Sequence, residues 1–320
     1  MKSICVIGSL NIDLVAAVER FPQPGETLTA AGYSTFFGGK GGNQAIALGK
    51  LGANVKMVGK VGDDIHGSDY IRNLRMNGVD TAGIRVEKGA STGTAMILVD
   101  PQGENQIVIS PGANGHLTPS DIDEHWSHLI ESDIFLFQLE IPIGTIAYAM
   151  KRLKQAGKTI VLDPAPASQL PDSLFKYIDY MTPNETEVKY YANRHHQYVL
   201  QLKEAANILL RKGVQTIVAK AGAEGAYLIR DADLQHIGAY PTDPVDTTGA
   251  GDCFNAGFAY ALAMGRSVEE AVSLGNAVGA LAIRQVGAQS AMPSIEEVDV
   301  FMKKHLLGSE SDSYRQLGGA

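Results

Sequence analysis

A glycine-rich segment near the C-terminal end of the chain, PVDTTGAGDCFNAGF, has the composition of a phosphate-binding turn. Its small residues Gly249, Ala250 and Gly251 precede an apolar-periodic stretch from about residue 253 to residue 263, which predicts a helix. The backbone N–H groups of such a turn lie at the positive end of the helix dipole. We therefore expect the three small residues to form an anion hole for a nucleotide or for a phosphoryl group in transfer.

Asp252 stands inside this predicted anion site, where its carboxylate would repel phosphate. An aspartate that repels phosphate at this position is explained if Asp252 is a general base, which takes the proton of a hydroxyl that attacks a γ-phosphoryl group. Aspartate is also a common helix cap, because its side chain accepts hydrogen bonds from the first free amides of a helix. The segment alone leaves both interpretations of Asp252 open.

A second glycine-rich segment, FFGGKGGNQAIALGKLG, lies near the N-terminal end, and Asn43 is predicted to open a helix there. It is not a Walker A loop, because Lys40 is followed by glycine, and no GxGxxG fingerprint follows the first predicted strand. Asn43 offers two donors and an acceptor to sugar hydroxyls, whereas the alternative is a flexible turn that Asn43 caps. Four glycines around the lysine would let the backbone approach a ligand closely: Gly38, Gly39, Gly41 and Gly42.

Short β-branched runs alternate with stretches of helical period, and these elements must position the two segments. SICVIGS and VKMVGKV are typical of strands, while GNQAIALGKLG and SDYIRNLRMNG have helical period. The continuous apolar runs DIFLFQ, KTIVLDP and QTIVAKAG indicate strands buried on both faces. Together these patterns predict an α/β fold with a doubly wound, mostly parallel sheet flanked by helices.

Two stretches, residues 13–37 and 93–110, break this rhythm and are predicted to be inserted hairpins. Such hairpins lie off the main sheet, where they can form a small β-sheet lid over the crevice at the carboxyl ends of its strands. The edges of an exposed lid would be unpaired, so we expect a homodimer that covers them. The whole domain is expected to span residues 1–307, with a flexible polar tail at 308–320.

The composition excludes several classes of protein. A formal net charge of -8 leaves no excess of Lys and Arg for binding nucleic acid. No apolar stretch approaches the roughly 20 residues of a membrane-spanning helix, and the N-terminus carries no export signal. Only two cysteines, Cys5 and Cys253, are present, so a disulfide framework is not expected. These features predict a cytoplasmic protein.

The segments GGKGGNQA and DTTGAGDCFNAGF, in this order and at this separation, resemble the two signatures of the ribokinase (pfkB) family of carbohydrate kinases. The similarity covers roughly residues 3–307 and includes GSLNID, PGAN, LFQLE, DPAPA and PNETE. The resemblance implies transfer of a phosphoryl group from ATP to a sugar hydroxyl, with Asp252 of the GAGD motif as catalytic base. It also implies dimers that pair through the lid sheets.

The resemblance further implies which residues hold the sugar. Asn11 and Asp13 match the sugar-binding pair of the family, and Glu140, at the end of a predicted strand, matches another sugar contact. These positions suit the crevice at the carboxyl ends of parallel strands. The glycine-rich segment that holds the sugar in the family corresponds to Gly39, Lys40, Gly41, Gly42 and Asn43.

On the nucleotide side, Asn184 and Glu187 match the NxxE motif of the family, and Glu187 is expected to hold Mg²⁺ through bound water. The alternative is a solvated helix start that Asn184 caps. KAGAEG matches the turn that covers the nucleotide in the family, with Lys220 where Thr is frequent. Asn276 matches a position near the adenine; the alternative is an interior asparagine whose hydrogen bonds are all made within the protein. The ATP contacts implied are Asn184, Lys220, Gly222, Gly225, Gly251 and Asn276.

The resemblance also implies K⁺ as an activator, bound beside the anion hole. Asp246 and the carbonyl of Thr248 would supply ligands from one loop. Ala291 stands where the family often has Ser, so the site loses a ligand, uses Ser290 or a backbone carbonyl, or binds K⁺ weakly. The alternative is that Asp246 only stabilises its turn. The ligands from the second loop, AIRQVGAQSAMP, would be Ala282, Gln285, Gly287 and Ala291.

The acceptor expected first is D-ribose, phosphorylated on its 5-hydroxyl. A sister kinase that acts on deoxyribose, another sugar, a sugar acid or a nucleoside is the second hypothesis, because lid and crevice side chains determine the sugar. A non-catalytic sugar sensor is a third hypothesis, against which the intact Asp252 argues. A dehydrogenase is disfavoured, because the dinucleotide fingerprint is absent.

Overall fold

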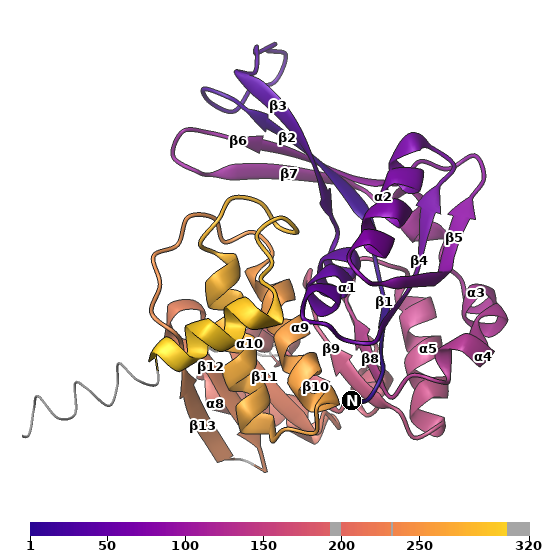
Figure 1. Ribbon diagram of the computed structural model, residues 1–320, viewed down its shortest axis with the longest axis vertical. Helices are drawn as coiled ribbons and strands as arrows, with labels where there is room; N and C mark the ends of the chain where they lie inside the picture. The colour runs from indigo at the N-terminus through magenta and orange to yellow at the C-terminus, as the bar shows by residue number, and fades with distance from the viewer. Residues whose placement is uncertain (193–199, 232, 306–320) are drawn as a thin grey trace, which may run out of the picture.

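The computed structural model describes residues 1–192, 200–231 and 233–305, and a nine-stranded sheet forms its centre (Figure 1). The strand order is β13-β12-β11-β10-β9-β8-β1-β4-β5, and all neighbours from β11 to β5 are parallel. The antiparallel strands β12 and β13 extend one edge. The bounds are β1 Ile4–Ile7, β4 Val55–Gly62, β5 Asp80–Glu87, β8 Ile134–Phe137, β9 Thr159–Leu162, β10 Tyr180–Met181, β11 Thr216–Lys220, β12 Gly225–Arg230 and β13 Asp233–Gly238.

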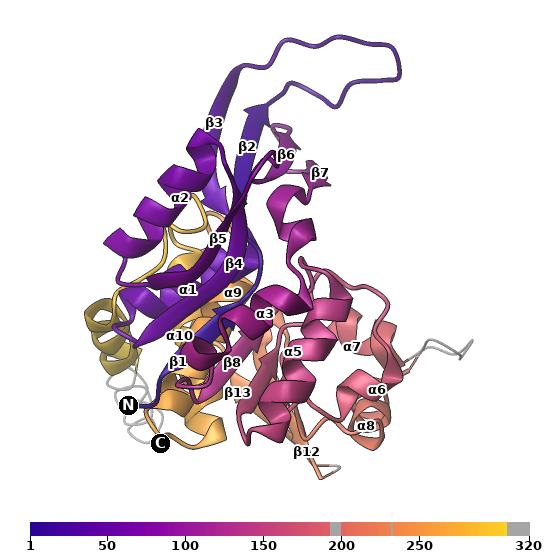
Figure 2. The ribbon, with the colours of Figure 1, turned by 90° about the vertical axis from the view of Figure 1, so that its right-hand side faces the viewer.

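Helices cover both faces of this sheet (Figures 1 and 2). Ile4 and Val6 of β1 pack into one core cluster and Cys5 and Ile7 into the other, because side chains alternate along a strand. The doubly wound fold predicted from continuous apolar runs is confirmed. One face carries α1 (Lys40–Lys50), α2 (Ile65–Met76), α9 (Ala250–Ala263) and α10 (Val268–Ala282); the other carries α3 (Pro119–Glu124), α4 (Trp126–Leu129), α5 (Ile143–Gln155), α6 (Asp172–Phe175), α7 (Glu185–Ala192) and α8 (Leu202–Arg211).

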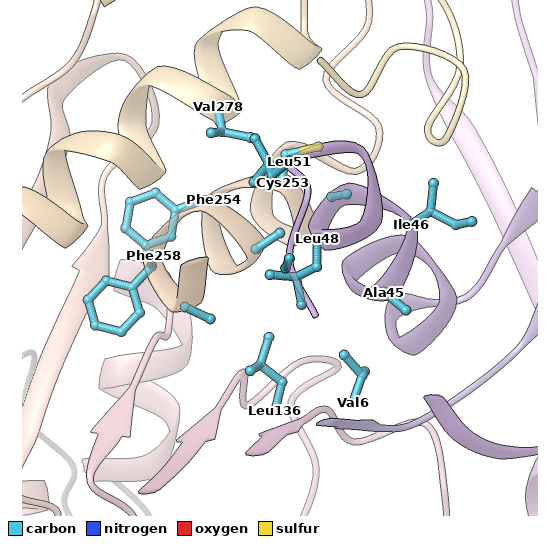
Figure 3. Close-up of a cluster of buried hydrophobic side chains, with 14 of the residues drawn as sticks. Val6, Ala45, Ile46, Leu48, Leu51, Leu136, Cys253, Phe254, Phe258 and Val278 are labelled. Carbon is cyan, nitrogen blue, oxygen red and sulfur yellow. The ribbon is translucent and has the colours of Figure 1, made fainter. Parts of the chain in front are cut away.

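The packing of α9 fixes the position of its N-terminus. In Figure 3, Val6 and Leu136 of the sheet face side chains from α1 and α9, among them Leu48. On the other side of α9, α10 crosses closely because Gly257 has no side chain: a Cβ there would lie 2.8 Å from a methyl carbon of Val278. The first turn of α9 is therefore held between the sheet, α1 and α10.

A separate four-stranded sheet projects from the large one (Figures 1 and 2). Its order is β3-β2-β6-β7, with β2 and β3 forming one antiparallel hairpin and β6 and β7 another. The sequence does not indicate how these hairpins join, and the structure shows that β2 and β6 pair in parallel. The bounds are β2 Asn11–Ala17, β3 Gly32–Gly38, β6 Gly93–Val99 and β7 Asn105–Ser110.

Two predicted helix starts need correction. The helix α1 begins at Lys40 instead of Asn43, and α9 begins at Ala250 instead of about residue 253. Each follows a glycine with positive φ, 82° at Gly39 and 77° at Gly249, and this conformation turns the chain directly into the helix. The expected tail at 308–320 lies outside the described residues. Among the described helices, none is long and apolar enough to cross a membrane.

Two short 3₁₀ helices complete the part of the chain that the structure describes. They are η1 (Gly112–His116), which follows β7, and η2 (Gly222–Glu224), which joins β11 to β12. η1 packs against β4 and β6, so it lies where the small sheet meets the large one. It thereby brings the PGAN segment to the carboxyl end of β1.

Candidate active site

The predicted site residues gather where the order of the large sheet reverses, between β1 and β8. From this point β4 and β5 extend one way and β9 to β11 the other, and such switch points form ligand crevices at the carboxyl ends of strands. Here Ser9, which follows β1, donates its hydroxyl to Glu140, which follows β8, at 2.5 Å. The amide of Lys40 donates to the same carboxylate at 3.0 Å, so Glu140 joins both strands to the start of α1.

Asp252 lies in the first turn of α9 and is 5% exposed, but it does not cap that helix. Its side chain turns to α1, where it accepts hydrogen bonds from Asn43 Nδ2 at 2.9 Å and Gln44 Nε2 at 3.1 Å. The N-cap position is Gly249, which has no side chain. The helix-cap interpretation of Asp252 is therefore wrong. Asn43, predicted to open α1, instead orients the Asp252 carboxylate.

Burial raises the pKa of Asp252 to about 6, with Lys40 lowering it and Asp163 raising it further. Burial alone would lower the pKa of Lys40, but the charges of Asp252, Asp163, Glu140 and Glu187 raise it above its ordinary value. Lys40 is therefore a permanent cation among carboxylates. A carboxylate with a pKa near 6 is ionised at neutral pH and can accept a proton, which suits a general base.

The amides of the first turn of α9 provide part of the predicted anion hole. Among the described residues, the amides of Gly251 and Asp252 donate no hydrogen bond. The amide of Ala250 donates to the carbonyl of Thr247 at 3.2 Å. Two amides at the positive end of α9 are thus free for an anion, while the third is engaged in the turn.

Asp13 on β2 forms the opposite side of the predicted sugar site. Burial, followed by the charges of Glu140 and Asp252, raises the pKa of Asp13 to about 7. Its carboxylate lies against Gly38 of the paired strand β3, where any Cβ would overlap it. Asp13 lies against Gly38, Glu140 accepts from the Lys40 amide and Asp252 accepts from Asn43, so these acids and Lys40 meet around the start of α1.

Asn11 is buried and partly engaged by a residue of the PGAN segment. Asn114 Nδ2 donates to Asn11 Oδ1 at 2.7 Å and to the carbonyl of Leu10 at 3.1 Å. Asn114 Oδ1 accepts from the Leu10 amide at 2.9 Å. The Asn11 side chain is thus held with its amide nitrogen as the group left for a ligand.

The glycines of the second segment have a packing role that the sequence interpretation missed. A Cβ on Gly41 would lie 2.6 Å from the Ser9 amide nitrogen, and one on Gly42 would overlap the Tyr70 hydroxyl. The amides of Gly41 and Gly42 both donate to Ser9, so neither is free for a sugar. The sugar contacts expected of this segment stay predictions, and those of Gly41 and Gly42 would have to use atoms other than their amides.

A cavity of about 660 Å³ adjoins the N-terminus of α9 and has all of the predicted nucleotide residues except Asn184 on its wall. Lys220 and Gly251 lie at its inner end, where a Cβ on Gly251 would be 3.4 Å from Lys220 Nζ. Asn276 Nδ2 donates to the carbonyls of Ile237 and Gly238, both at 3.0 Å, so this asparagine also fastens α10 to β13. The other predicted contacts on the wall are Gly222 and Gly225.

Asn184 and Glu187 form a reciprocal cap at the start of α7. The amide of Asn184 donates to Glu187 Oε2 and the amide of Glu187 donates to Asn184 Oδ1, both at 2.8 Å. Asn184 therefore caps α7, but the helix start is not solvated as the alternative expected, because Glu187 is buried; the ATP contact of Asn184 stays a prediction. Burial raises the pKa of Glu187, and its second carboxylate oxygen accepts no hydrogen bond from the described residues. That oxygen is the candidate for a water on Mg²⁺.

The two loops of the predicted cation site meet at Asp246. Its carboxylate accepts from the amide of Thr248 at 2.9 Å and from the amide of Gly287 at 2.8 Å, which keeps the pKa of Asp246 low. These bonds also fit a purely turn-stabilising role. Ser290 donates its hydroxyl to the carbonyl of Val286 at 3.2 Å, and a cation ligand from Ser290 in place of Ala291 stays a prediction. Ala282 ends α10, while Gln285 and Ala291 line a wider groove of about 1140 Å³ next to the nucleotide cavity.

Four supporting residues were not found from the sequence, and all are buried amides or acids. Gln44 bridges Asp252 and Asp163, and Gln138 donates to Gln44 Oε1 at 2.6 Å. Gln289 donates to Asn43 Oδ1 at 3.1 Å, so it orients the amide that holds Asp252. Asp163 had a signal, since it follows an apolar strand in DPAPA, but the glutamines have none in the sequence.

Comparison with known proteins agrees with this geometry. The model of the pfkB family of carbohydrate kinases matches residues 1–295. A ribokinase from Bacillus subtilis is 38% identical over 304 residues, which cover 93% of this chain and 99% of that protein. A deoxyribokinase from Salmonella typhi is 36% identical over 301 residues, with coverage of 93% and 98%.

A solved structure is similar over nearly the same span. The Arabidopsis thaliana ribokinase complexed with ribose and ATP superposes with a TM-score of 0.88 at 32% identity, covering 94% of this chain and 99% of that one. The large parallel sheet with a small separate sheet is therefore shared with a protein whose complex contains both a sugar and a nucleotide.

Proposed function

Because this chain belongs to the pfkB family of carbohydrate kinases and is a phosphotransferase that acts on a hydroxyl group, we propose that it phosphorylates the 5-hydroxyl of D-ribose with ATP. Similarity to the B. subtilis ribokinase and to the Arabidopsis complex with ribose and ATP supports this acceptor. The observation that carries the proposal is the position of Asp252. It lies between the free amides of α9 and the carboxylates of the sugar side.

In the proposed mechanism, Asp252 accepts the proton of the attacking 5-hydroxyl while that oxygen forms its bond to the γ-phosphorus of ATP. The bond between this phosphorus and the bridging oxygen of ADP breaks. The amides of Gly251 and Asp252 stabilise the charge that gathers on the transferring group, and Lys40 adds a permanent positive charge nearby. Asn11, Asp13, Gly39, Asn43 and Glu140 orient the sugar.

The nucleotide would occupy the cavity beside α9, with Lys220, Gly222 and Gly225 near the phosphates and Asn276 farther along its wall. Glu187 would hold Mg²⁺ through water, and the ion supplies charge neutralisation on the phosphates when bound. Among the described residues no cluster of three His, Cys, Asp or Glu side chains could hold a metal. This fits an ion that is bound mainly by phosphate and water. The cytoplasm is the compartment we propose, since Cys5 and Cys253 are buried free thiols.

The first prediction concerns the acceptor. With ATP and Mg²⁺, a panel of pentoses, hexoses, sugar acids and nucleosides should give the highest kcat/KM for D-ribose. 2-Deoxy-D-ribose is the decisive competitor, because a deoxyribokinase is 36% identical to this chain. A tenfold preference for another acceptor would overturn ribose but leave the kinase assignment intact. Sugar binding without transfer to any acceptor would support the sensor hypothesis instead.

We also propose K⁺ as an activator, held by Asp246 and by carbonyls that include those of Thr248, Ala282, Gln285 and Gly287. Gln289 of the same loop bonds to Asn43, which holds Asp252, so a cation that orders this loop would also order the base. Replacing K⁺ by tetramethylammonium, at fixed Mg²⁺ and ionic strength, should therefore slow phosphotransfer severalfold. The Asp246→Ala variant should lose this response, while Asp233→Ala, an exposed control, should keep it. Equal rates in the two salts would contradict a cation site.

We further propose a homodimer through the small sheet. Its edge strand β7 is exposed along its length and presents Ile107, Val108 and Ile109. Light scattering at micromolar concentration should give twice the chain mass of 34.1 kDa. The double variant Ile107→Glu/Ile109→Glu should be monomeric, and Met76→Glu, an exposed control on α2, should remain a dimer. A monomeric mass for the unaltered protein, with and without ribose, would exclude this assembly.

A further inference from the structure

Asp163, at the carboxyl end of β9, is a buried carboxylate for which the mechanism above has no use. It is 3% exposed, and its Oδ1 lies 3.1 Å from Lys220 Nζ, whose side chain is 16% exposed. Asp163 and Lys220 lie close together because the parallel strands β9 and β11 end on the same edge of the sheet. An ion pair that is removed from water this far contributes little net stability, because desolvation offsets the attraction.

A single amide links this ion pair to the base. Gln44 Nε2 donates to Asp163 Oδ2 at 3.2 Å and to Asp252 Oδ1 at 3.1 Å. The amide cannot turn over, because its Oε1 accepts a hydrogen bond of 2.6 Å from Gln138 Nε2. Both carboxylates therefore accept a hydrogen bond from the same NH₂ group. A change at Asp163 would alter the position of this group and so the orientation of Asp252.

Lys220 is also placed at the anion end of α9. Its amide donates to the carbonyl of Pro183 at 2.8 Å, which fixes the strand end that carries it. Its ammonium lies next to Gly251, whose amide is free, and it lines the nucleotide cavity. The positive charge of Lys220 therefore stands between Asp163 and the proposed site of the phosphates.

We propose that Asp163 is a positioning residue, which acts through Gln44 to orient the base Asp252, and that Lys220 is the counter-ion that balances its charge. This inference rests on the proposed role of Asp252 in phosphotransfer. The negative charge of Asp163 raises the pKa of Asp252, which agrees with the geometry. The charged or titratable groups around Asp252 are Lys40, Asp163, Asp13 and Tyr70 on other elements, Cys253 next to it on α9, Lys220 beside Gly251, and Glu140 and Glu187 around Lys40.

The test compares three variants by the acidic limb of kcat against pH at saturating D-ribose and ATP, because kcat/KM would also report the protonation of Asp13. In Asp163→Asn the repulsion disappears, so the pKa of Asp252 falls and the limb should move to lower pH by about half a unit or more. In Lys220→Met the charge of Asp163 is no longer balanced, so the limb should move to higher pH. The double variant has neither charge, and its limb should return close to that of the unaltered enzyme.

A matched pair serves as control. Lys212, which follows α8, and Asp172 of α6 form an ion pair at the same distance, 3.1 Å. The variants Asp172→Asn and Lys212→Met should leave the limb where it is. A role limited to folding would lower activity at all pH values without opposite shifts, and thermal unfolding of each variant shows whether it is folded. Limbs that coincide in Asp163→Asn and the unaltered enzyme would overturn the proposal.

A measurement without substrate separates this inference from the proposed function. In enzyme labelled with ¹³C at aspartate carboxyl groups, the resonance that disappears in Asp252→Asn belongs to Asp252, and its titration gives the pKa directly. Asp163→Asn should lower this pKa, and Lys220→Met should raise it. If phosphotransfer fails with every acceptor but these shifts occur, the coupling stands and the kinase proposal falls. If transfer occurs and the shifts do not, only the coupling is wrong.

Discussion

Replacing Asp252 by Asn is expected to lower kcat for D-ribose by about 10²-fold or more, the usual scale for loss of a general base. Asn cannot take the hydroxyl proton, whereas the amides of α9 and the charge of Lys40 remain. The expected change is therefore in kcat, with affinities for ATP and sugar largely kept. A coupled assay of ADP release gives kcat, and titration calorimetry gives both affinities.

Folding must be checked in the same variant, because Asn43 and Gln44 both donate to the Asp252 carboxylate. An Asn at this position can accept from only one of them without bringing two donors together. The Asp252→Ala variant avoids that conflict, and Asp299→Asn, at an exposed carboxylate, serves as the charge-matched control. Turnover of Asp252→Ala close to that of the control would remove Asp252 from the mechanism.

The second large effect is expected at Asp13. The change Asp13→Asn should lower kcat/KM for D-ribose by about 10²-fold, because a charged acceptor for sugar hydroxyls becomes a neutral one that accepts fewer bonds. Since these bonds hold the sugar before and during transfer, most of the loss should appear in KM. The pKa of Asp13, about 7, adds a pH signature. Below that pH the unaltered enzyme should lose affinity for sugar as Asp13 takes up a proton, and the variant should not.

The control for this variant is Glu104→Gln, which neutralises an exposed carboxylate beside β7 of the same small sheet. It should leave kcat and KM unchanged. Steady-state kinetics over a range of ribose concentrations at saturating ATP, repeated from pH 5.5 to 8.5, separates the two parameters. A kcat/KM of Asp13→Asn within twofold of the control would place the sugar elsewhere.

The fold class followed from the sequence because the signal is local. Runs such as ICVI in β1 and IFLF in β8 are apolar at every position, and only a strand covered on both faces uses such a run. A helix N-terminus with free amides could likewise be predicted from Gly249, Ala250 and Gly251, because the conformation of a turn depends on residues that are neighbours in sequence. The position of Asp252 in that turn was equally visible.

What the tertiary structure decided is the direction of side chains and the choice of partners. Whether Asp252 caps α9 or faces α1 depends on Asn43 and Gln44, more than two hundred residues away in sequence. The same is true of the packing of Gly42, whose missing side chain leaves space for the Tyr70 hydroxyl, a role that the sequence did not indicate.

The supporting amides were not predictable, because a glutamine is a common surface residue and nothing in its neighbours shows that it will be buried. Gln44 and Gln138 become hydrogen-bond partners only because the parallel strands end at one edge of the sheet and α1 packs over these strand ends. Asp163 and Lys220 likewise become a pair only through the order of β9 and β11. The sequence by itself thus determined the elements and the reacting group, because these depend on local pattern. The tertiary structure determined the pKa of that group and the side chains that hold it, because burial and charge proximity depend on contacts between distant segments.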